Sequence, residues 1–271
     1  MTAIALPTIA ATPRSNWFGQ TGQIFYRWIL ATVRQIWGPV MSLLQPIIWI
    51  LLFGAVFSSL GQLPTFGGAS YIQYLVPGVL MMTVLYSGAW AGTGYIDDMK
   101  SGVMDQLLSA PIGRSAIVTG PLLQQLVINA AQSAIVLGIG WLGGARYPGG
   151  VGGILLALVA ATLLATTFCC ASTAVALITG NQLALIMVSQ IVVLPATFLS
   201  TTMMPATLLP DWVANIAQYN PLTWAVEVAR TGLAGTEDWA LVAGRLGLLA
   251  ALAALAFFWS VRSIRSYQRS L

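Results

Sequence analysis

Long apolar runs separated by short polar segments dominate the chain. A helix that crosses a bilayer needs about 20 mostly apolar residues, and we count six candidates. They are residues 39–60, 74–96, 115–142, 151–178, 183–202 and 239–261. The runs are too long for barrel strands of about 10 residues and lack their alternation, and helices satisfy their own backbone hydrogen bonds in lipid. The pattern predicts an all-α integral membrane protein, with six transmembrane helices in a single domain over residues 1–271.

A short amphipathic segment, residues 98–112, interrupts this pattern between the second and third runs. On a helical projection its apolar and polar residues separate onto two faces. The first face holds Val103, Met104, Leu107 and Leu108, and the second holds Lys100, Ser101, Asp105 and Ser109. Pro111 ends the helix or bends it into the next run. We interpret the segment as a short helix on the membrane surface to which a soluble partner can bind. The alternative is a simple surface loop.

Residues 17–37, before the first run, have the pattern of a helix that lies in the membrane surface. The apolar positions include Phe18, Phe25, Trp28, Ile29, Ile36 and Trp37, whereas Gln20, Gln23, Arg27 and Arg34 fall on another face. Aromatic side chains on one side and arginines on the other are typical of interfacial helices. The alternative is an ordinary flank of a membrane span, with basic residues on the cytoplasmic side.

The connection between the fifth and sixth runs, residues 203–238, is also unusual. It contains Pro205, Pro210 and Pro221, together with apolar stretches at residues 212–217 and 222–233 that are too short to span a bilayer. Two short helices that dip into the membrane and return fit this pattern, and so do two helices that lie flat outside it. Glu227 and Arg230 have the spacing of a local ion pair.

Composition narrows the class of protein. Hydrophobic residues make up 58% of the chain and charged residues 7%, far below the roughly 25% of soluble domains. The net charge of +4 comes from scattered arginines, so we expect no nucleic-acid partner. Histidine is absent, which excludes Ser-His and Cys-His catalytic pairs. The adjacent Cys169 and Cys170 lie inside an apolar run, and we interpret them as small packing residues.

The basic residues orient the chain. With the N-terminus inside, eight lie on the inner side: Arg14, Arg27, Arg34, Lys100, Arg114, Arg262, Arg265 and Arg269. Three lie outside, Arg146, Arg230 and Arg245. The positive-inside rule therefore favours both termini in the cytoplasm, with residues 98–112 inside and residues 203–238 outside.

Polar residues within the runs are candidates for a translocation path. None of the seven acidic residues lies near the centre of a run, which argues against a proton-driven transporter. In the third run, Gln125, Asn129, Gln132 and Ser133 share one helical face. They either bond helices to one another or line a wet path. The single lysine, Lys100, is not in a phosphate-binding loop, so we expect no nucleotide and no cofactor on this chain.

Three segments together resemble a permease subunit of the ABC-2 type of ATP-binding-cassette transporters, closest to daunorubicin-resistance-like drug exporters. They are Ser-Gly-Val-Met-Asp-Gln-Leu-Leu-Ser-Ala-Pro-Ile at residues 101–112, the proline-rich connection through Asn220-Pro221-Leu222-Thr223, and the aromatic and basic segment before the first run, followed by Gln45-Pro46. The resemblance covers nearly the whole chain. One departure is Asp97-Asp98-Met99-Lys100, where the family often has glutamates, so Asp98 and Asp105 both remain candidates for contact with the ATPase.

The resemblance implies roles for residues in three regions. It implies an ATPase-coupling helix over residues 98–111, with Asp98, Lys100, Asp105, Leu107, Leu108 and Pro111. It implies a connecting helix over residues 17–37, with Phe25, Arg27, Trp28 and Arg34. It implies an external re-entrant hairpin at an outer gate over residues 203–230, with Pro205, Pro210, Trp212, Asn220, Pro221, Glu227 and Arg230.

The resemblance also implies an exporter of hydrophobic or amphipathic molecules, such as drugs or lipids, in the plasma membrane. The chain would pair with a second permease chain, identical or homologous, and with two ABC ATPase subunits that hold ATP and Mg²⁺. Gln125, Asn129 and Gln132 are then the candidates for the translocation path. Three alternatives remain: export of a lipid-linked polysaccharide, a channel or assembly subunit without an ATPase, and an intramembrane enzyme.

Overall fold

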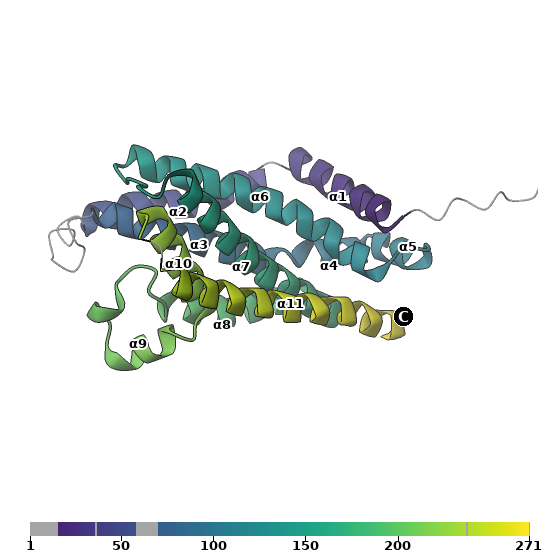
Figure 1. The fold of residues 1–271 in the computed structure, drawn as a ribbon. Helices are drawn as coiled ribbons and strands as arrows, with labels where there is room; N and C mark the ends of the chain where they lie inside the picture. Colours follow the sequence, from purple (N-terminus) through teal and green to yellow (C-terminus); the bar gives the residue numbers. More distant parts are fainter. Residues whose placement is uncertain (1–15, 36, 58–69, 237, 271) are drawn as a thin grey trace, which may run out of the picture.

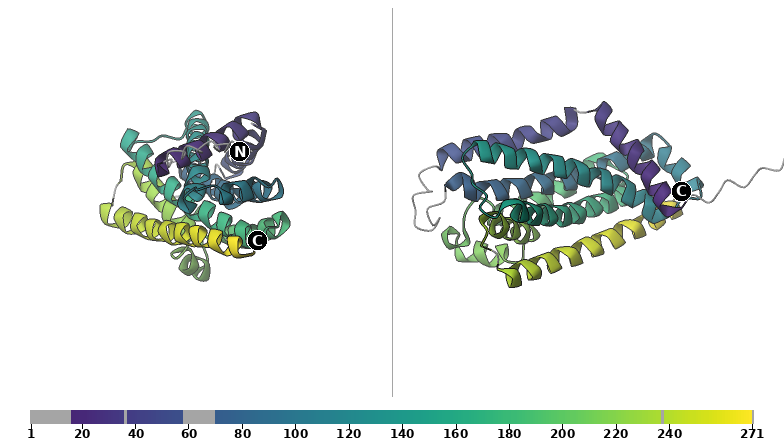
Figure 2. Two further views of the ribbon diagram at one scale, coloured as in Figure 1. Left: turned by 90° about the vertical axis from the view of Figure 1, so that its right-hand side faces the viewer. Right: turned by 45° about the horizontal axis from the view of Figure 1, so that its top comes forward.

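The computed structural model describes residues 16–35, 37–57, 70–236 and 238–270, and within these ranges all regular structure is helical (Figure 1). The elements form an elongated bundle, with α1, α5 and the C-terminus at one end and α9 at the other (Figures 1 and 2). In chain order they are α1 (Trp17–Arg34), α2 (Trp37–Val56), α3 (Tyr71–Trp90), α4 (Thr93–Lys100), α5 (Val103–Ser109), α6 (Arg114–Leu142), α7 (Gly150–Thr179), α8 (Gln182–Phe198), the 3₁₀ turn η3 (Ala206–Leu208), α9 (Asp211–Ala217), α10 (Pro221–Ala234) and α11 (Trp239–Ser270).

Each of the six predicted apolar runs is largely helical over its described residues. Within the described residues, four stretches are long and apolar enough to cross a membrane: Tyr71–Lys100, Arg114–Leu142, Gly150–Thr179 and Trp239–Arg265. The apolar helices Val40–Val56 and Gln182–Phe198 are shorter. The predicted end of the first run, residues 58–60, lies outside the described residues.

The helix formed by the fifth run ends earlier than predicted. The expected helix extended to residue 202, whereas α8 ends at Phe198. The side-chain amide of Asn220 donates hydrogen bonds to the carbonyl oxygens of Ala196 and Leu199, at 2.7 and 2.8 Å. These bonds satisfy carbonyl groups at the helix end, so the chain can leave the helix in a buried place without unpaired backbone groups.

The second run is divided into α3 and α4, although the sequence predicted one helix. The break lies at Gly92, whose N–H donates to the Ser172 hydroxyl of α7 at 3.0 Å. A Cβ atom on Gly92 would come 2.5 Å from the Ser172 carbonyl oxygen, so only glycine allows this approach. The junction therefore depends on a contact with a helix 80 residues away in sequence.

The centre of the bundle is α7, which contacts α3, α6, α8, α10 and α11. Its buried positions are rich in alanine and other small residues, which allow membrane helices to approach closely. Cys169 and Cys170 are free and buried among them, which confirms their interpretation as packing residues.

The outward faces of several helices are strongly apolar. Leu51 of α2 is 64% exposed and Ile191 of α8 is 71% exposed, and both lie among other exposed apolar side chains of the same helix. Soluble monomers rarely expose apolar patches of this extent. The arrangement agrees with helices that face lipid or another membrane chain.

Candidate functional site

The predicted surface helix over residues 98–111 is in fact two short helices. α4 carries Asp98 and Lys100, and α5 follows after Gly102, which has a φ angle of +74°. This left-handed conformation favours glycine, so the chain turns sharply between the helices. The prediction of one helix that reaches Pro111 is therefore wrong, because α5 ends at Ser109 and Pro111 is exposed beyond it.

α5 has the two faces that the sequence predicted. Met104 is 1% exposed, and Leu107 and Leu108 pack against the same apolar cluster. Lys100 and Asp105 are exposed. The segment thus presents charged side chains at one end of the bundle, while its apolar face is anchored in the core.

Side chains of α1 hold both ends of this segment. Arg27 forms a two-point ion pair with Asp98, with nitrogen–oxygen distances of 2.5 and 3.0 Å. Gln20 donates to the carbonyl oxygen of Pro111 at 3.2 Å and accepts a hydrogen bond from the N–H of Gly113 at 3.0 Å. We call α1, α4 and α5 with the chain to Gly113 the coupling unit, because these contacts tie its parts together.

Asp98 therefore contacts the connecting helix instead of standing free for a soluble partner. Its side chain is 17% exposed, and Asp105 becomes the more accessible of the two candidate carboxylates. The contact of Gln20 was missed by the sequence reasoning. The available signal was its spacing of seven residues from Arg27, which places both side chains on one helical face.

The other predicted residues of the connecting helix have different surroundings. The ring of Trp28 lies 5.4 Å from the ring of Tyr95 in α4, measured between centroids, and covers Gly94. Phe25 is half-buried, and Arg34 is exposed near the end of α1. Trp28 joins Arg27 in contacting α4, so two of the four predicted residues meet the segment that follows α3.

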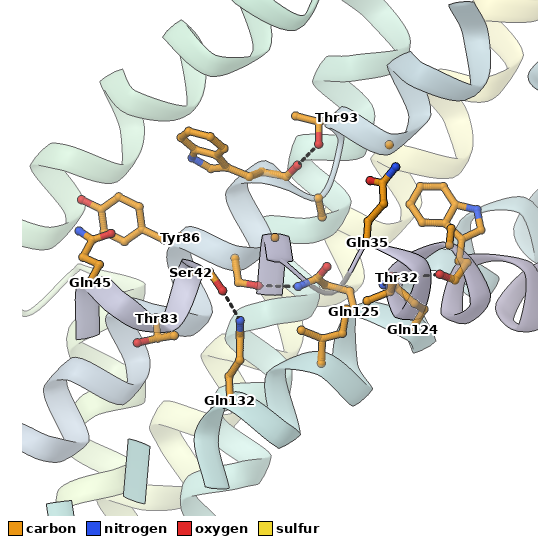
Figure 3. A pocket seen from close by; sticks show the side chains of 18 of the residues that line it. Thr32, Gln35, Ser42, Gln45, Thr83, Tyr86, Thr93, Gln124, Gln125 and Gln132 are labelled. Atoms are coloured by element: carbon orange, nitrogen blue, oxygen red, sulfur yellow. Dashed lines mark hydrogen bonds between the residues drawn. The ribbon is translucent and has the colours of Figure 1, made fainter. Parts of the chain in front are cut away.

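A cavity of about 860 Å³ lies beside the coupling unit. Side chains from α1, α2, α3, α4 and α6 line it (Figure 3). Gln125 and Gln132, two of the predicted path residues, are among them, as is Gln124. Asn129 is buried next to the cavity lining and accepts a hydrogen bond from Gln125 at 3.2 Å.

The glutamines of α6 both bridge helices and line the cavity. Gln125 donates to Ser87 of α3 at 2.6 Å, and Gln132 donates to Ser42 of α2 at 2.6 Å (Figure 3). Gln124 donates to Thr32 of α1 at 2.7 Å. The two alternatives that the sequence left open, helix packing and a polar lining, are therefore present together. Gln124 is a lining residue that the sequence reasoning did not select.

At the opposite end of the bundle, the two apolar stretches of the proline-rich connection form α9 and α10, as expected for short helices. Most of α10 is buried against α3, α7 and α11. Asn220 caps α10 by accepting from the N–H of Leu222 at 2.9 Å, and Pro221 occupies its first turn. Trp212 of α9 is exposed.

Arg230 of α10 holds the non-helical stretch after α8 in place. Its guanidinium lies 3.5 Å above the ring centroid of Tyr74, and it donates to the carbonyl oxygens of Tyr74 and Thr202 at 3.3 and 2.7 Å. The hydroxyl of Tyr74 donates to the carbonyl of Thr201 at 3.0 Å. One arginine thus joins α10, α3 and the segment that leads to Pro205 and Pro210.

The predicted ion pair between Glu227 and Arg230 is wrong. Glu227 pairs with Arg245 of α11 at 2.8 Å, whereas Arg230 turns toward carbonyl groups. Residues three apart on a helix are neighbours, but both side chains here find better-placed partners on other elements. The acidic and basic residues of α10 therefore connect it to two different helices.

Comparison with known proteins agrees with this arrangement. The family described as ABC-2 type transporter matches residues 19–234. The daunorubicin resistance ABC transporter permease protein DrrB1 of Streptomyces coeruleorubidus is 26% identical over 225 residues, which cover 77% of this chain and 76% of the relative. The inner membrane transport permease YadH of Escherichia coli K12 is 25% identical over 215 residues, covering 77% and 80%.

A third relative matches over a smaller part. The putative transport permease ycf38 of Cyanophora paradoxa is 27% identical over 192 residues, which are 70% of this chain and 66% of the relative. The family match includes nearly all of the coupling unit, the cavity and all of α10. This chain is an integral membrane protein that belongs to the ABC-2 type transporter family.

Proposed function

We propose that this chain is the permease subunit of an ATP-driven exporter of a hydrophobic or amphipathic molecule, such as a drug or a lipid. It works in the plasma membrane with a second permease chain, identical or homologous, and with two ABC ATPase subunits that hold ATP and Mg²⁺. Family membership and the name of the Streptomyces relative support this proposal. The observation that carries it is the coupling unit, a charged and anchored surface at one end of the bundle.

In the proposed mechanism, the ATPases close on ATP and push α5 through its exposed face. Met104, Leu107 and Leu108 anchor α5 in the apolar core, so the segment moves as a body. The ion pair of Arg27 with Asp98 carries this motion to α1. The lining of the cavity includes residues of α1 and α4, so movement of the coupling unit changes the shape of the cavity.

The six-span topology completes the proposal. α2 and α8 would cross the membrane together with the four longer stretches, and both termini would lie in the cytoplasm. The exposed side chains of Lys100, Arg114, Arg262 and Arg265 support this orientation, because they belong to segments at the end of the bundle that holds α5 and the C-terminus (Figure 2). α9 and α10 would form a re-entrant hairpin at the outer gate, with α10 packed into the bundle.

The test is affinity purification of the chain from its native membrane in mild detergent, followed by identification of bound proteins and an ATPase assay. We expect a stoichiometric ABC ATPase to accompany the wild-type chain and to be lost with Asp105→Arg, because the charge reversal lies on the exposed face of α5. Asp211→Arg is the matched control, since Asp211 is also exposed and in the first turn of a short helix, α9, at the opposite end.

Two outcomes would contradict the proposal. A chain that purifies without any nucleotide-hydrolysing partner in every detergent tried would instead be a channel or assembly subunit. An ATPase that binds Asp105→Arg as well as it binds the wild type would remove α5 as the coupling surface.

A further inference from the structure

The floor of the cavity beside the coupling unit is polar and uncharged. Among the described residues, five glutamines line the cavity: Gln35, Gln45, Gln124, Gln125 and Gln132. Gln124 and Gln132 are buried at its floor, whereas Gln35 and Gln45 are exposed. A carboxamide can both donate and accept hydrogen bonds. The floor therefore presents hydrogen-bond donors and acceptors to a ligand but carries no charge.

The charged side chains of the lining are confined to α1 and α4, and their charges cancel. Arg27 and Asp98 neutralise each other in the ion pair already described. Arg34 and Asp97, the other two charged residues of the lining, have opposite signs and are exposed. A cavity built in this way has no net charge with which to select an anionic or a cationic head group.

One buried acceptor in the lining has no partner. Gln132 is 3% exposed, and its side-chain oxygen Oε1 forms no hydrogen bond with the residues that the structure describes. Its amide nitrogen donates to Ser42 (Figure 3), and the oxygen is buried away from the cavity space. An unpaired buried polar atom is costly, which favours a turn of the Gln132 carboxamide toward a ligand that brings a hydroxyl or an amide N–H.

The cavity also has an apolar side, to which Trp49, Val79, Met82 and Ile128 contribute. The volume of about 860 Å³ lies within the range of small-molecule sites. Polar groups on the floor combined with apolar walls suit a molecule that has a polar head and an apolar body. The exposed apolar residues of α2, such as Leu44 and Ile48, form a neighbouring surface along which an acyl or alkyl chain can extend.

We propose that this cavity binds the uncharged, hydroxyl- or amide-bearing head group of an amphipathic molecule, with the glutamine carboxamides of its lining, Gln132 among them, as hydrogen-bond partners. The proposal rests on the proposed function, because it names the chemical class of the cargo and the place where the cargo docks. The same head-group chemistry occurs in membrane glycolipids and in glycosylated amphiphiles that arrive from water.

The experiment uses the full chain, with whatever subunits purify with it, in phosphatidylcholine nanodiscs. The probe is dodecyl maltoside with a photoactivatable diazirine in its alkyl chain, and mass spectrometry locates the labelled residues. We expect labels on α2 and α6 within the cavity. Unlabelled dodecyl maltoside should compete, whereas dodecyl phosphate and dodecyltrimethylammonium, which have the same tail and charged head groups, should not.

Gln132→Leu removes one of these carboxamides with little change in volume, and we expect it to weaken binding of the probe about tenfold, as for the loss of one buried hydrogen bond. Gln190→Leu is the matched control, because Gln190 is a half-buried glutamine of α8 outside the cavity lining. Gln45→Leu, on the exposed rim, gives a second variant that leaves the buried packing untouched. We expect it to weaken binding severalfold.

Equal labelling of wild type and both cavity variants would overturn the proposal, as would equal competition by a charged amphiphile. Competition by a diglucosyl diacylglycerol built into the nanodisc would support a membrane source, and competition only by soluble maltoside would support an aqueous source. The purification experiment that tests the proposed function gives an independent result. Labelled cavity residues without an ATPase would contradict the exporter but keep the site, and an ATPase with labels elsewhere would contradict only the site.

Discussion

The two ends of the bundle are held together in different ways. At the α10 end, Arg230 and Asn220 donate four hydrogen bonds to backbone carbonyls of distant segments. At the coupling end, α1 is attached to the segment after α3 by side chains that are partly exposed, chiefly Arg27, with 37% of its side chain exposed, and Gln20. Several bonds from two side chains to backbone carbonyls restrain motion, whereas contacts between partly exposed side chains of two helices can break and re-form. The comparison suggests a rigid α10 end and an adjustable coupling end.

Of the substitutions that test this comparison, Arg230→Ala should cause the largest loss of stability. The substitution leaves the carbonyls of Tyr74 and Thr202 without their donor, and we expect a loss of about 3 kcal/mol in the free energy of unfolding, since hydrogen bonds to charged groups are worth about 1.5–3 kcal/mol each. Thermal unfolding of the purified chain in detergent measures it. Arg146→Ala is the control, because Arg146 is exposed between α6 and α7. Equal melting temperatures of the two variants would show that the α10 end is not held by this arginine.

A smaller effect is expected at the turn between α4 and α5. Gly102→Ala meets no steric contact within 4 Å but keeps a φ angle of +74°, which costs a side-chain-bearing residue about 1 kcal/mol. Gly22→Ala is the opposite control. It lies inside α1 with open space around it, and alanine there should stabilise the helix by about 1 kcal/mol. Unfolding midpoints that shift in the same direction would contradict the strained turn.

The smallest effect on stability is expected from the ion pair between Arg27 and Asp98. Because both side chains are partly exposed, their coupling energy should be below about 1 kcal/mol in a double-mutant cycle of unfolding. Export should nevertheless fall clearly in Arg27→Ala and in Asp98→Ala, since the pair links α1 to the coupling segment. Restoration of transport by the exchange of the two charges would sharpen the comparison. A large loss of stability in either single variant would instead show that the pair stabilises the fold.

Much of the architecture followed from local pattern. The apolar runs formed helices because lipid-compatible segments of this length satisfy their backbone groups in that way. α5 shows its predicted faces because residues three and four apart share a side of a helix, and the short stretches of the proline-rich connection became α9 and α10. The candidates Gln125 and Gln132 were also visible in this way, since their spacing placed them on one face of α6.

Pairings between distant residues were not visible. Asp98 was one of two candidate carboxylates for contact with the ATPase, and its pairing with Arg27, 71 residues away in sequence, was not predicted. Glu227 was expected to pair within its helix and instead binds Arg245 of α11. A charged side chain near a helix end has several possible partners, and the choice among them depends on how the helices cross.

The amino-acid sequence by itself determined that this protein is a helical membrane protein with an amphipathic segment at one end, because periodicity and length are local properties. Only the tertiary structure decided where α3 gives way to α4, where α8 ends, and that Gln124 and Gln132 close one cavity with α1 and α2. Those features arise where Ser172, Asn220 and Ser42 approach backbone or side chains from other helices. Hydrogen bonds of this kind become available only after the helices have packed.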